Sequence, residues 1–419
     1  MPFISFLYPT RDRAKFLDRC LFAMLQSKYK NFEIIISDNS IGQSARPVFD
    51  IYSNDPRISY FWTGGNLSMA ENYSFALSKA KGEFVSALTD KIFLKKQSLS
   101  LIHKIITKNN LDLLNWREST FVLTDEDNNL DEGFIYNLRY NNNIILYDPK
   151  KTLDYLLGFY KHRSEDNDYY HSGKIFMGCV KRDLIQNYID SNSFFQMYAP
   201  DYTSRIIILS EVKRCAEVTL PLQSSFQTNV STGARCAKYP DVAYNFFYES
   251  DKMVLAEKYF PIKGLYSSQQ NHVAGDYLHM IDVLKLNWKI NYKNLYNTIL
   301  YDLIRVDWPN SELKSQHWRL LLAKVREGGV RIYLAILFYF LPLQLIKYYK
   351  SLAFKKLLAM YFRIRNPKSG NGVRMNRIYF SKFEDAIERM NDSRDTSGSP
   401  KRLSMSFIFL KNSTFRSFG

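Results

Sequence analysis

The sequence predicts an α/β fold: a mostly parallel sheet with helices on both faces, followed by a C-terminal helical region. Two observations lead to this fold class. Strand and helix patterns alternate through the first 90 residues, and helical patterns dominate from about residue 243 to 330. Strands that alternate with helices usually run parallel, because each crossover helix returns the chain to the same edge of the sheet.

The first elements follow this pattern closely. Phe3–Tyr8 is a short apolar run ended by Pro9, which is typical of a buried parallel strand. Ala14–Ser27 has apolar residues at intervals of three and four, as in an amphipathic helix. A second strand, Phe32–Ser37, is closed by Asp38-Asn39-Ser40.

A third strand, Ile58–Trp62, leads into Gly64-Gly65-Asn66, and a helix is expected over Met69–Ala80 before a strand at Glu83–Leu88. Ligands of open parallel sheets bind beyond the carboxyl ends of the strands. This rule selects three segments: Pro9-Thr10-Arg11, Asp38-Asn39-Ser40 and Thr89-Asp90-Lys91.

The middle of the chain is less regular. We expect a helix over 97–109, a polar stretch at Thr124–Glu132, and a strand at Lys174–Val180. Two stretches rich in Gly, Pro, Ser and Asn, Asn366–Gly372 and Asn391–Pro400, are typical of linkers. The expected division is an α/β, ligand-binding domain over 1–240, a helical region over 241–330 and a basic, aromatic tail over 331–419.

Other residue patterns exclude several classes of function. The cysteines stand far apart without a C-x-x-C pair, which favours a reducing cytoplasm over a disulfide framework or zinc site. The chain opens directly on a strand-like run, so we expect no export signal. Neither a Walker loop nor a G-x-G-x-x-G motif is present, which argues against ATP hydrolysis and dinucleotide chemistry.

The net charge of +16 is concentrated in the tail. From Arg319 onward there are 20 Lys and Arg against 6 Asp and Glu, while the preceding 318 residues hold 37 against 35. Such a tail is expected to bind an anionic surface. Nucleic acid is the poorer partner, because no nucleic-acid-binding motif surrounds the tail.

Arg331–Lys350 contains about 15 mainly apolar residues between basic flanks. This falls short of the ~20 residues that span a bilayer, and Pro342 interrupts the run. We therefore expect helices that lie in the interface of an anionic inner membrane. The alternatives are a buried helix of the C-terminal region and an oligomer interface.

Four segments in the N-terminal part resemble the family 2 inverting glycosyltransferases, which have a GT-A fold. The first, Ile4–Arg13, corresponds to the family's opening strand and loop, and the second, Asn31–Ser40, to its second strand with the acidic end. The third, Gly65–Asn72, corresponds to the Asn-containing loop and helix, and the fourth, Ala80–Asp90, to the strand leading to the DxD site. A weaker similarity extends through Ala199–Tyr202 and Ser231–Gly233.

The resemblance implies a nucleotide-sugar donor and names the residues that would hold it. Asp38 would accept hydrogen bonds from the base or ribose, although an Asx turn is the alternative. Arg13 would lie near the phosphates or else be a solvated arginine. The remaining candidate donor-binding residues are Pro9, Thr10, Arg11, Asn39, Asn66, Asn72, Thr89, Asp90 and Lys91.

The DxD position departs from the family pattern. Thr89-Asp90-Lys91 offers one carboxylate where the family usually has two or three that hold Mg²⁺ or Mn²⁺. Asp90 would be the metal ligand if a metal is used. Alternatively, Lys91 would stabilise the leaving diphosphate directly.

Inverting transfer requires a general base, and the resemblance assigns it to Asp201, next to Pro200 at the expected start of a helix. The alternative role of Asp201 is a helix cap, and the rival bases are Glu211 and Asp183. Ser231-Thr232-Gly233 would close on the phosphates.

Together these features predict a bacterial glycosyltransferase of surface polysaccharide synthesis. It would act in the cytoplasm, peripherally on the inner membrane face, and transfer a sugar with inversion to a glycan or lipid-linked acceptor. The alternative is a catalytically silent nucleotide-sugar-binding or scaffold subunit, because carboxylates are missing at the DxD position.

Overall fold

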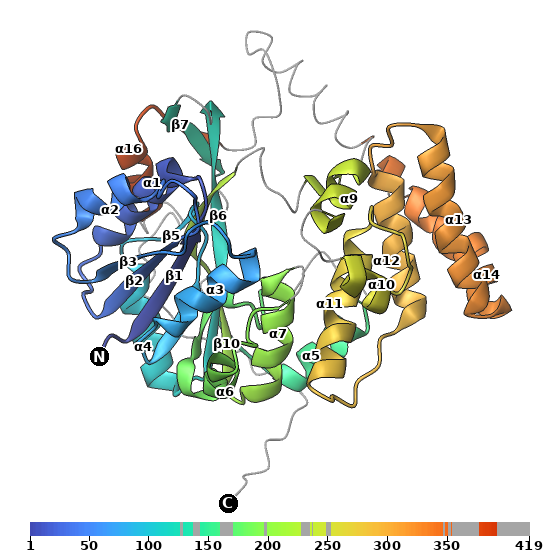
Figure 1. The fold of residues 1–419 in the computed structure, drawn as a ribbon, viewed down its shortest axis with the longest axis horizontal. Coiled ribbons are helices and arrows are strands. Elements are labelled where there is room, and N and C mark those ends of the chain that lie inside the picture. The colour runs from blue at the N-terminus through green and yellow to red at the C-terminus, as the bar shows by residue number, and fades with distance from the viewer. Residues whose placement is uncertain are drawn as a thin grey trace, which may run out of the picture.

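The computed structural model describes residues 1–125, 129–136, 143–159, 171–196, 199–227, 235–236, 238–248, 253–346, 348–350, 353 and 377–391. Within these residues an 11-stranded sheet lies beside a cluster of helices (Figure 1). The linkers expected at 366–372 and after 391 fall outside the described residues.

The first half of the sheet is parallel, as predicted. Short apolar segments form its strands, which lie side by side in the order β3 (Ile58–Trp62), β2 (Phe32–Asp38), β1 (Ile4–Thr10) and β4 (Phe84–Ala87). Nearly every side chain of β1, β2 and β4 is buried, whereas most of β3 is only partly buried.

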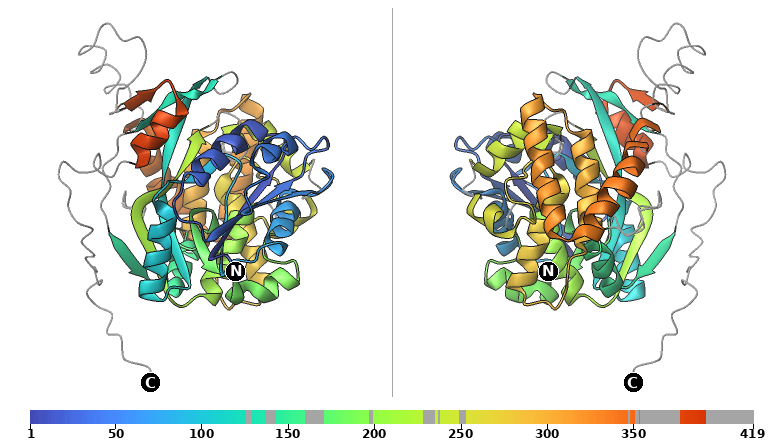
Figure 2. Two further views of the ribbon diagram at one scale, coloured as in Figure 1. Left: turned by 90° about the vertical axis from the view of Figure 1, so that its left-hand side faces the viewer. Right: turned by 90° about the vertical axis from the view of Figure 1, so that its right-hand side faces the viewer.

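Helices α1 (Ala14–Leu25), α2 (Arg46–Tyr52) and α3 (Met69–Ser78) connect these strands. The start of α3 is determined locally: Ser68 accepts from the Glu71 backbone N–H, and the Glu71 carboxylate accepts from the Ser68 N–H. The two faces of the sheet are covered by helices (Figure 2).

The second half of the sheet is largely antiparallel, which the sequence did not predict. β9 (Gly178–Lys181) pairs antiparallel with β4 and β6 (Leu113–Asp125), and β7 (Asn129–Tyr136) pairs antiparallel with β6. The polar stretch at 124–132 therefore belongs partly to a β-hairpin.

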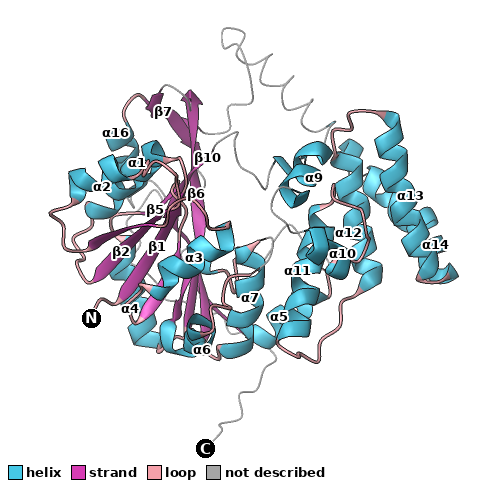
Figure 3. Cartoon of the chain, in the orientation of Figure 1, coloured by secondary structure: helices cyan, strands magenta, loops and turns pink. Residues whose placement is uncertain are grey.

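A second long strand, β10 (Cys215–Gln227), pairs parallel with β6 and antiparallel with β5 (Ile92–Leu94) and β8 (Ile144–Tyr147). Charged and polar residues interrupt β6 and β10, so neither shows a clean strand periodicity in the sequence. The α/β class is confirmed, and the sheet is mixed (Figure 3).

The prediction of a single strand over Lys174–Val180 was wrong in part. Ile175–Met177 forms a turn of 3₁₀-helix (η1), and the strand β9 begins only at Gly178. The helix expected at 97–109 is confirmed as α4 (Ser98–Asn109). The other short helices of this part are α5 (Pro149–Leu157), η2 (Arg182–Ile185), α6 (Gln186–Asp190) and α7 (Pro200–Glu211).

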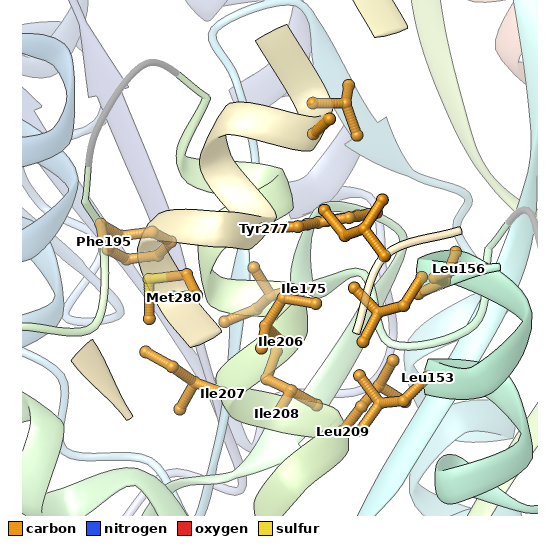
Figure 4. Packing of buried hydrophobic residues seen from close by; sticks show 14 of the residues in the cluster. Leu153, Leu156, Ile175, Phe195, Ile206, Ile207, Ile208, Leu209, Tyr277 and Met280 are labelled. Atoms are coloured by element: carbon orange, nitrogen blue, oxygen red, sulfur yellow. The ribbon is translucent and has the colours of Figure 1, made fainter. Parts of the chain in front are cut away.

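The segment after residue 240 is helical, as predicted. Its helices are α9 (Pro240–Tyr248), α10 (Met253–Tyr259), α11 (Gln269–Val283), α12 (Tyr292–Arg305) and α13 (Ser311–Glu327). The buried face of α7 contributes Ile206 and Leu209 to a core shared with Tyr277 and Met280 of α11 (Figure 4). One continuous core therefore joins the helical region to the sheet.

The apolar run after residue 330 forms a longer helix than expected. It comprises α14 (Val330–Ala335), a π-helical segment η3 (Ile336–Phe340) and a continuation to Lys350, a total of 21 residues. Pro342 does not end it. By length and composition alone this helix is long and apolar enough to cross a membrane, so the expectation of a segment that is too short was wrong.

The tail also returns to the sheet, which was not predicted. β11 (Arg377–Phe380) pairs antiparallel with β7, and α16 (Phe383–Asn391) follows it. The Phe383 side chain is fully buried against Phe93, Phe121 and Phe226, which come from three other strands. This part of the tail is structurally a component of the N-terminal sheet.

Candidate functional site

The three strand ends selected from the sequence lie together. In the parallel register Thr10 is opposite Asp38, and the Asn39 N–H donates to the Thr10 carbonyl at 2.9 Å. The Thr10 hydroxyl donates to the Asp90 Oδ2 atom at 3.0 Å. The ends of β1, β2 and β4 therefore form one edge.

Asp90 is almost fully buried at this edge, and its loop is held by side chains from the core. The Cys20 thiol donates to the Asp90 carbonyl at 3.4 Å, the Tyr8 hydroxyl donates to the Ile92 carbonyl at 2.6 Å, and the Tyr73 hydroxyl donates to the Leu88 carbonyl at 3.1 Å. The position of the Asp90 carboxylate is thus determined by the fold.

Burial raises the pKa of Asp90 to about 6, against the opposing effect of Arg13, the Thr10 hydroxyl and Lys91. The Arg13 Nη1 atom lies 3.6 Å from the Asp90 Oδ1 atom. A buried carboxylate with a shifted pKa beside two cations is typical of a functional site.

The DxD position offers a divalent cation a single carboxylate, that of Asp90. The two Asp90 oxygens face the Thr10 hydroxyl and the Arg13 guanidinium. Within the described part of the chain, no group of three or more His, Cys, Asp or Glu side chains is arranged to hold a metal. A cation here would have one carboxylate ligand, already paired with a guanidinium.

Asp38 is completely buried and accepts three hydrogen bonds. They come from the Ser40 N–H at 3.0 Å, the Ala45 N–H at 2.9 Å and the Tyr60 hydroxyl at 3.0 Å. The Asp38–Ser40 bond is the Asx turn that was the alternative to a nucleotide contact. In this structure Asp38 orders the loop that follows β2.

Two of the three candidate asparagines also have structural partners. Asn39 accepts from Thr63 at 2.9 Å and donates to the Leu67 carbonyl at 2.6 Å, so it holds the loop before α3. The Asn72 side chain pairs with the Ser37 hydroxyl and carbonyl. Asn66 is exposed in the loop that Asn39 holds.

The other candidates differ in exposure. Pro9 is buried within β1, and Arg11 is exposed beyond its end. The buried Thr89 hydroxyl has no hydrogen-bond partner among the described residues. Lys91 is partly exposed, and its carbonyl accepts from the Phe226 N–H at 2.9 Å, which ties the strand end to β10.

Asp201 lies in the first turn of α7, directly after Pro200. The N-cap position is Ala199, and the helix start has no side-chain cap hydrogen bond, so Asp201 does not serve as the cap. Burial raises the pKa of Asp201, while Lys174, Arg205 and backbone N–H groups of the first turn lower it.

Tyr73 connects the two acidic residues. It lies on α3 with its ring fully enclosed, and burial, followed by the charges of Asp90 and Asp201, raises its pKa. Both carboxylates are therefore within electrostatic range of one hydroxyl. The β4 strand end and the start of α7 therefore both lie near α3, although 110 residues separate Asp90 from Asp201 in the sequence.

The rival bases are positioned elsewhere. Glu211 lies at the opposite end of α7 from Asp201 and accepts from the Tyr188 hydroxyl at 2.6 Å. Asp183 lies in η2. The loop candidate at 231–233 falls outside the described residues.

The sequence missed the buried cations at the start of α7. Lys174 and Arg205 are almost fully buried, and both act electrostatically on Asp201. Neither belongs to a recognisable motif. Arg205 is one turn after Asp201 on the same helix, a spacing that offered a weak signal.

Comparison with known proteins finds a similarity to one family over the N-terminal part of the chain. Residues 5–172 match the model of the family described as glycosyl transferase family 2. This segment of the chain is similar to the family 2 glycosyltransferases. The matched segment includes the three strand ends, among them Thr89–Lys91 with Asp90.

Curated relatives agree with this assignment. An "uncharacterized glycosyltransferase" of Haemophilus influenzae is 28% identical over 112 residues, which cover 26% of this chain and 45% of that protein. The "GalNAc(5)-diNAcBac-PP-undecaprenol beta-1,3-glucosyltransferase" of Campylobacter jejuni is 32% identical over 105 residues, covering 24% and 34% respectively. The chain therefore spans less than half the length of these curated relatives.

Among solved structures, S. aureus TarS 1–349 aligns over 80% of this chain and 91% of its own length, with a TM-score of 0.43 and 12% identity. The same protein in complex with UDP-GlcNAc aligns with a TM-score of 0.43 and 13% identity.

Proposed function

We propose that this protein transfers a sugar, with inversion, from a nucleotide-sugar donor to a glycan or lipid-linked acceptor in bacterial surface polysaccharide synthesis. The observation that carries the proposal is the similarity of residues 5–172 to glycosyl transferase family 2, a segment that contains the buried Asp90. Asp201 follows this segment, and its charge, like that of Asp90, acts on Tyr73. The donor would occupy the edge formed by the ends of β1, β2 and β4.

The chain's own cations would meet the charge of the donor. Arg13 and Lys91 flank Asp90, and an ammonium or guanidinium stabilises the negative charge that develops on a leaving diphosphate. Asp90 positions these cations. The unpartnered Thr89 hydroxyl, at the same strand end, is a donor for a phosphate or ribose oxygen.

Asp201 would act as the general base. Its carboxylate removes the proton of the acceptor hydroxyl while that oxygen forms a bond to the anomeric carbon. The bond between this carbon and the diphosphate oxygen breaks on the opposite face, and the nucleoside diphosphate leaves with the electron pair. A base with a raised pKa is closer to the range in which it accepts a proton effectively at neutral pH.

The acceptor proposal draws on a relative and on the tail. The C. jejuni relative is named for an undecaprenol-linked acceptor, and the helix Val330–Lys350 of this chain has an exposed apolar face. A cytoplasmic enzyme held at the inner membrane face would meet such an acceptor at the surface where it is anchored.

The test combines donor binding with transfer. Calorimetry with uridine, guanosine and thymidine diphosphate sugars is expected to find one nucleotide that binds. Asp201→Asn should then reduce transfer by roughly 10²–10⁴-fold and leave donor affinity unchanged. The exposed Lys104→Met is the matched control, with wild-type binding and transfer.

Two results would contradict the proposal. Absence of affinity for every nucleotide sugar would remove the donor site. Donor binding without donor hydrolysis or transfer, across a panel of acceptors, would instead identify a catalytically silent subunit.

A further inference from the structure

The segment before η1 is held rigidly against the start of α7. Asn115, fully buried on β6, donates to the carbonyls of Lys174 and Met177 at 2.8 and 3.1 Å and accepts from the Gly173 N–H at 3.0 Å. The Arg205 guanidinium donates to the Ser172 carbonyl at 2.7 Å. Elements from both sides therefore position Lys174.

Gly173 makes this path of the chain possible. Its φ of +81° lies in the left-handed region, and a Cβ atom there would come within 2.7 Å of the Leu209 side chain on α7. The backbone can approach α7 this closely only without a side chain at that position. The close approach directs the next residue, Lys174, towards the helix start.

The Lys174 side chain is buried at the first turn of α7. Only 6% of the residue is exposed, and its Nζ atom lies 5.8 Å from the centre of the Tyr202 ring. Tyr202 directly follows Asp201. A buried ammonium is costly unless opposite charge lies nearby, and Asp201 and Glu118 are the carboxylates that act on it.

We propose that Lys174 is a positioning residue whose buried ammonium, beside the first turn of α7, orients the Asp201 carboxylate. The inference rests on the proposed role of Asp201 as base and adds a residue to that site. Burial raises the pKa of Asp201, and the charge of the Lys174 ammonium opposes this effect.

Other charged groups also face this pair. Arg205, on the same helix, also lowers the pKa of Asp201 but uses its Nε atom on the Ser172 carbonyl. Glu118 of β6 raises the pKa of Lys174 and accepts from Gln223 at 2.8 Å. Burial, acting first, brings the pKa of Lys174 down to about 8, so the ammonium is mostly charged at pH 7.

The decisive measurement is the titration of the Asp201 carboxyl group, followed by NMR in protein labelled with ¹³C at aspartate and assigned with Asp201→Asn. Lys174→Met should raise the pKa of Asp201 by roughly one unit or more, because the opposing charge is lost. Lys174→Arg should return most of the way to the wild-type value. An unchanged pKa in Lys174→Met would overturn the proposal.

If Lys174→Met does not fold, the reciprocal variant Asp201→Asn tests whether the two side chains interact. Asp201→Asn should lower the pKa of the Lys174 ammonium, measured by ¹⁵N NMR of labelled lysine, and an unchanged value would count against the pair. Neither titration depends on catalysis, so failure of the proposed transfer reaction is detected separately by the binding and transfer assays.

In the active enzyme the acidic limb of the kcat/KM profile should move to higher pH in Lys174→Met by the same shift, with donor affinity unchanged. The control is Lys104→Met on α4, which should leave the profile in place. A uniform loss of activity at all pH values, with no shift of the limb, would also overturn the assignment.

Discussion

Asp90 combines deep burial with a cationic partner, and its ionisation is coupled to folding. Its pKa of about 6 in the folded protein exceeds the ordinary value of 3.8. A raised folded-state pKa contributes stability that is fully present below the unfolded pKa and is lost as the pH rises through the folded pKa. The relevant window is therefore about pH 4 to 6.

Asp90→Asn should remove this pH dependence. Relative to the wild type, the variant is expected to gain stability between pH 4 and pH 7, by up to about 3 kcal/mol for a shift of about two pKa units. Urea unfolding at several pH values measures the difference. A constant difference across this range would show that Asp90 is not buried with a raised pKa.

The charge set around Asp90 also predicts how the enzyme responds to chelation. Arg13 and Lys91 place positive charge beside a single carboxylate, so we expect donor hydrolysis to survive EDTA. Lys91→Met should lower kcat by roughly 10²–10³-fold, as for loss of a group that stabilises the leaving charge. Loss of activity in EDTA, restored by Mg²⁺ or Mn²⁺, would refute this.

The strand ends illustrate what could be predicted residue by residue. Thr10, Asp38 and Asp90 were placed at one edge from strand boundaries alone, and they lie there. Their partners were not predictable. Tyr60 and the Ala45 N–H, which occupy the Asp38 carboxylate, come from a neighbouring strand and the loop before α2, and no local pattern links them to Asp38.

The C-terminal strand and helix show a similar limit for whole elements. β11 and α16 were assigned to a basic tail because their charge suggested an exposed surface, yet α16 buries Phe383 in the core of the N-terminal sheet. Burial of one aromatic side chain outweighs the polarity of the helix around it. Removing the tail would therefore also expose the face of the sheet beneath α16.

Phe383→Ala should lower the free energy of unfolding by about 3 kcal/mol, because it leaves a cavity among Phe93, Phe121 and Phe226. The matched control is Phe338→Ala, whose side chain is 77% exposed and whose loss should change stability by less than about 0.5 kcal/mol. Equal urea midpoints for the two variants would show that α16 is not docked.

The distribution of apolar surface over the helix Val330–Lys350 bears on where the protein resides. One face packs on α12 and α13: Ile336 is fully buried, and the Gln344 side chain donates to Asn297 at 2.9 Å. The other face exposes Leu334, Phe338 and Ile346. A helix packed along one side would have to leave its partners to span a bilayer, so we favour a position in the interface.

Leu334→Glu combined with Phe338→Glu should abolish binding to vesicles that contain anionic lipid, because both changes place charge on the exposed face. Binding of the wild type should weaken as salt is raised. Ile51→Glu, on the exposed side of α2, is the control. Sedimentation with vesicles measures the binding. If the exposed face is instead an oligomer interface, vesicle binding will be unchanged and light scattering will show the loss of a dimer in the variant.

Local patterns in the sequence determined the α/β class, the first four parallel strands and the edge where the donor is proposed to bind. Strand ends and short motifs are encoded within a few neighbouring residues, so they can be identified without knowledge of the packing. Four segments in the expected order were enough to indicate the family that residues 5–172 then matched.

Only the tertiary structure decided which side chains share a site. Asp90, Lys174 and Asp201 belong to a strand end, a loop and a helix start that long stretches of chain separate. The pairing of β9 with β4 and β6, and the packing of α7 between the sheet and α11, set how these three segments lie in the fold. These contacts depend on burial summed over the whole core, which no short window of sequence contains.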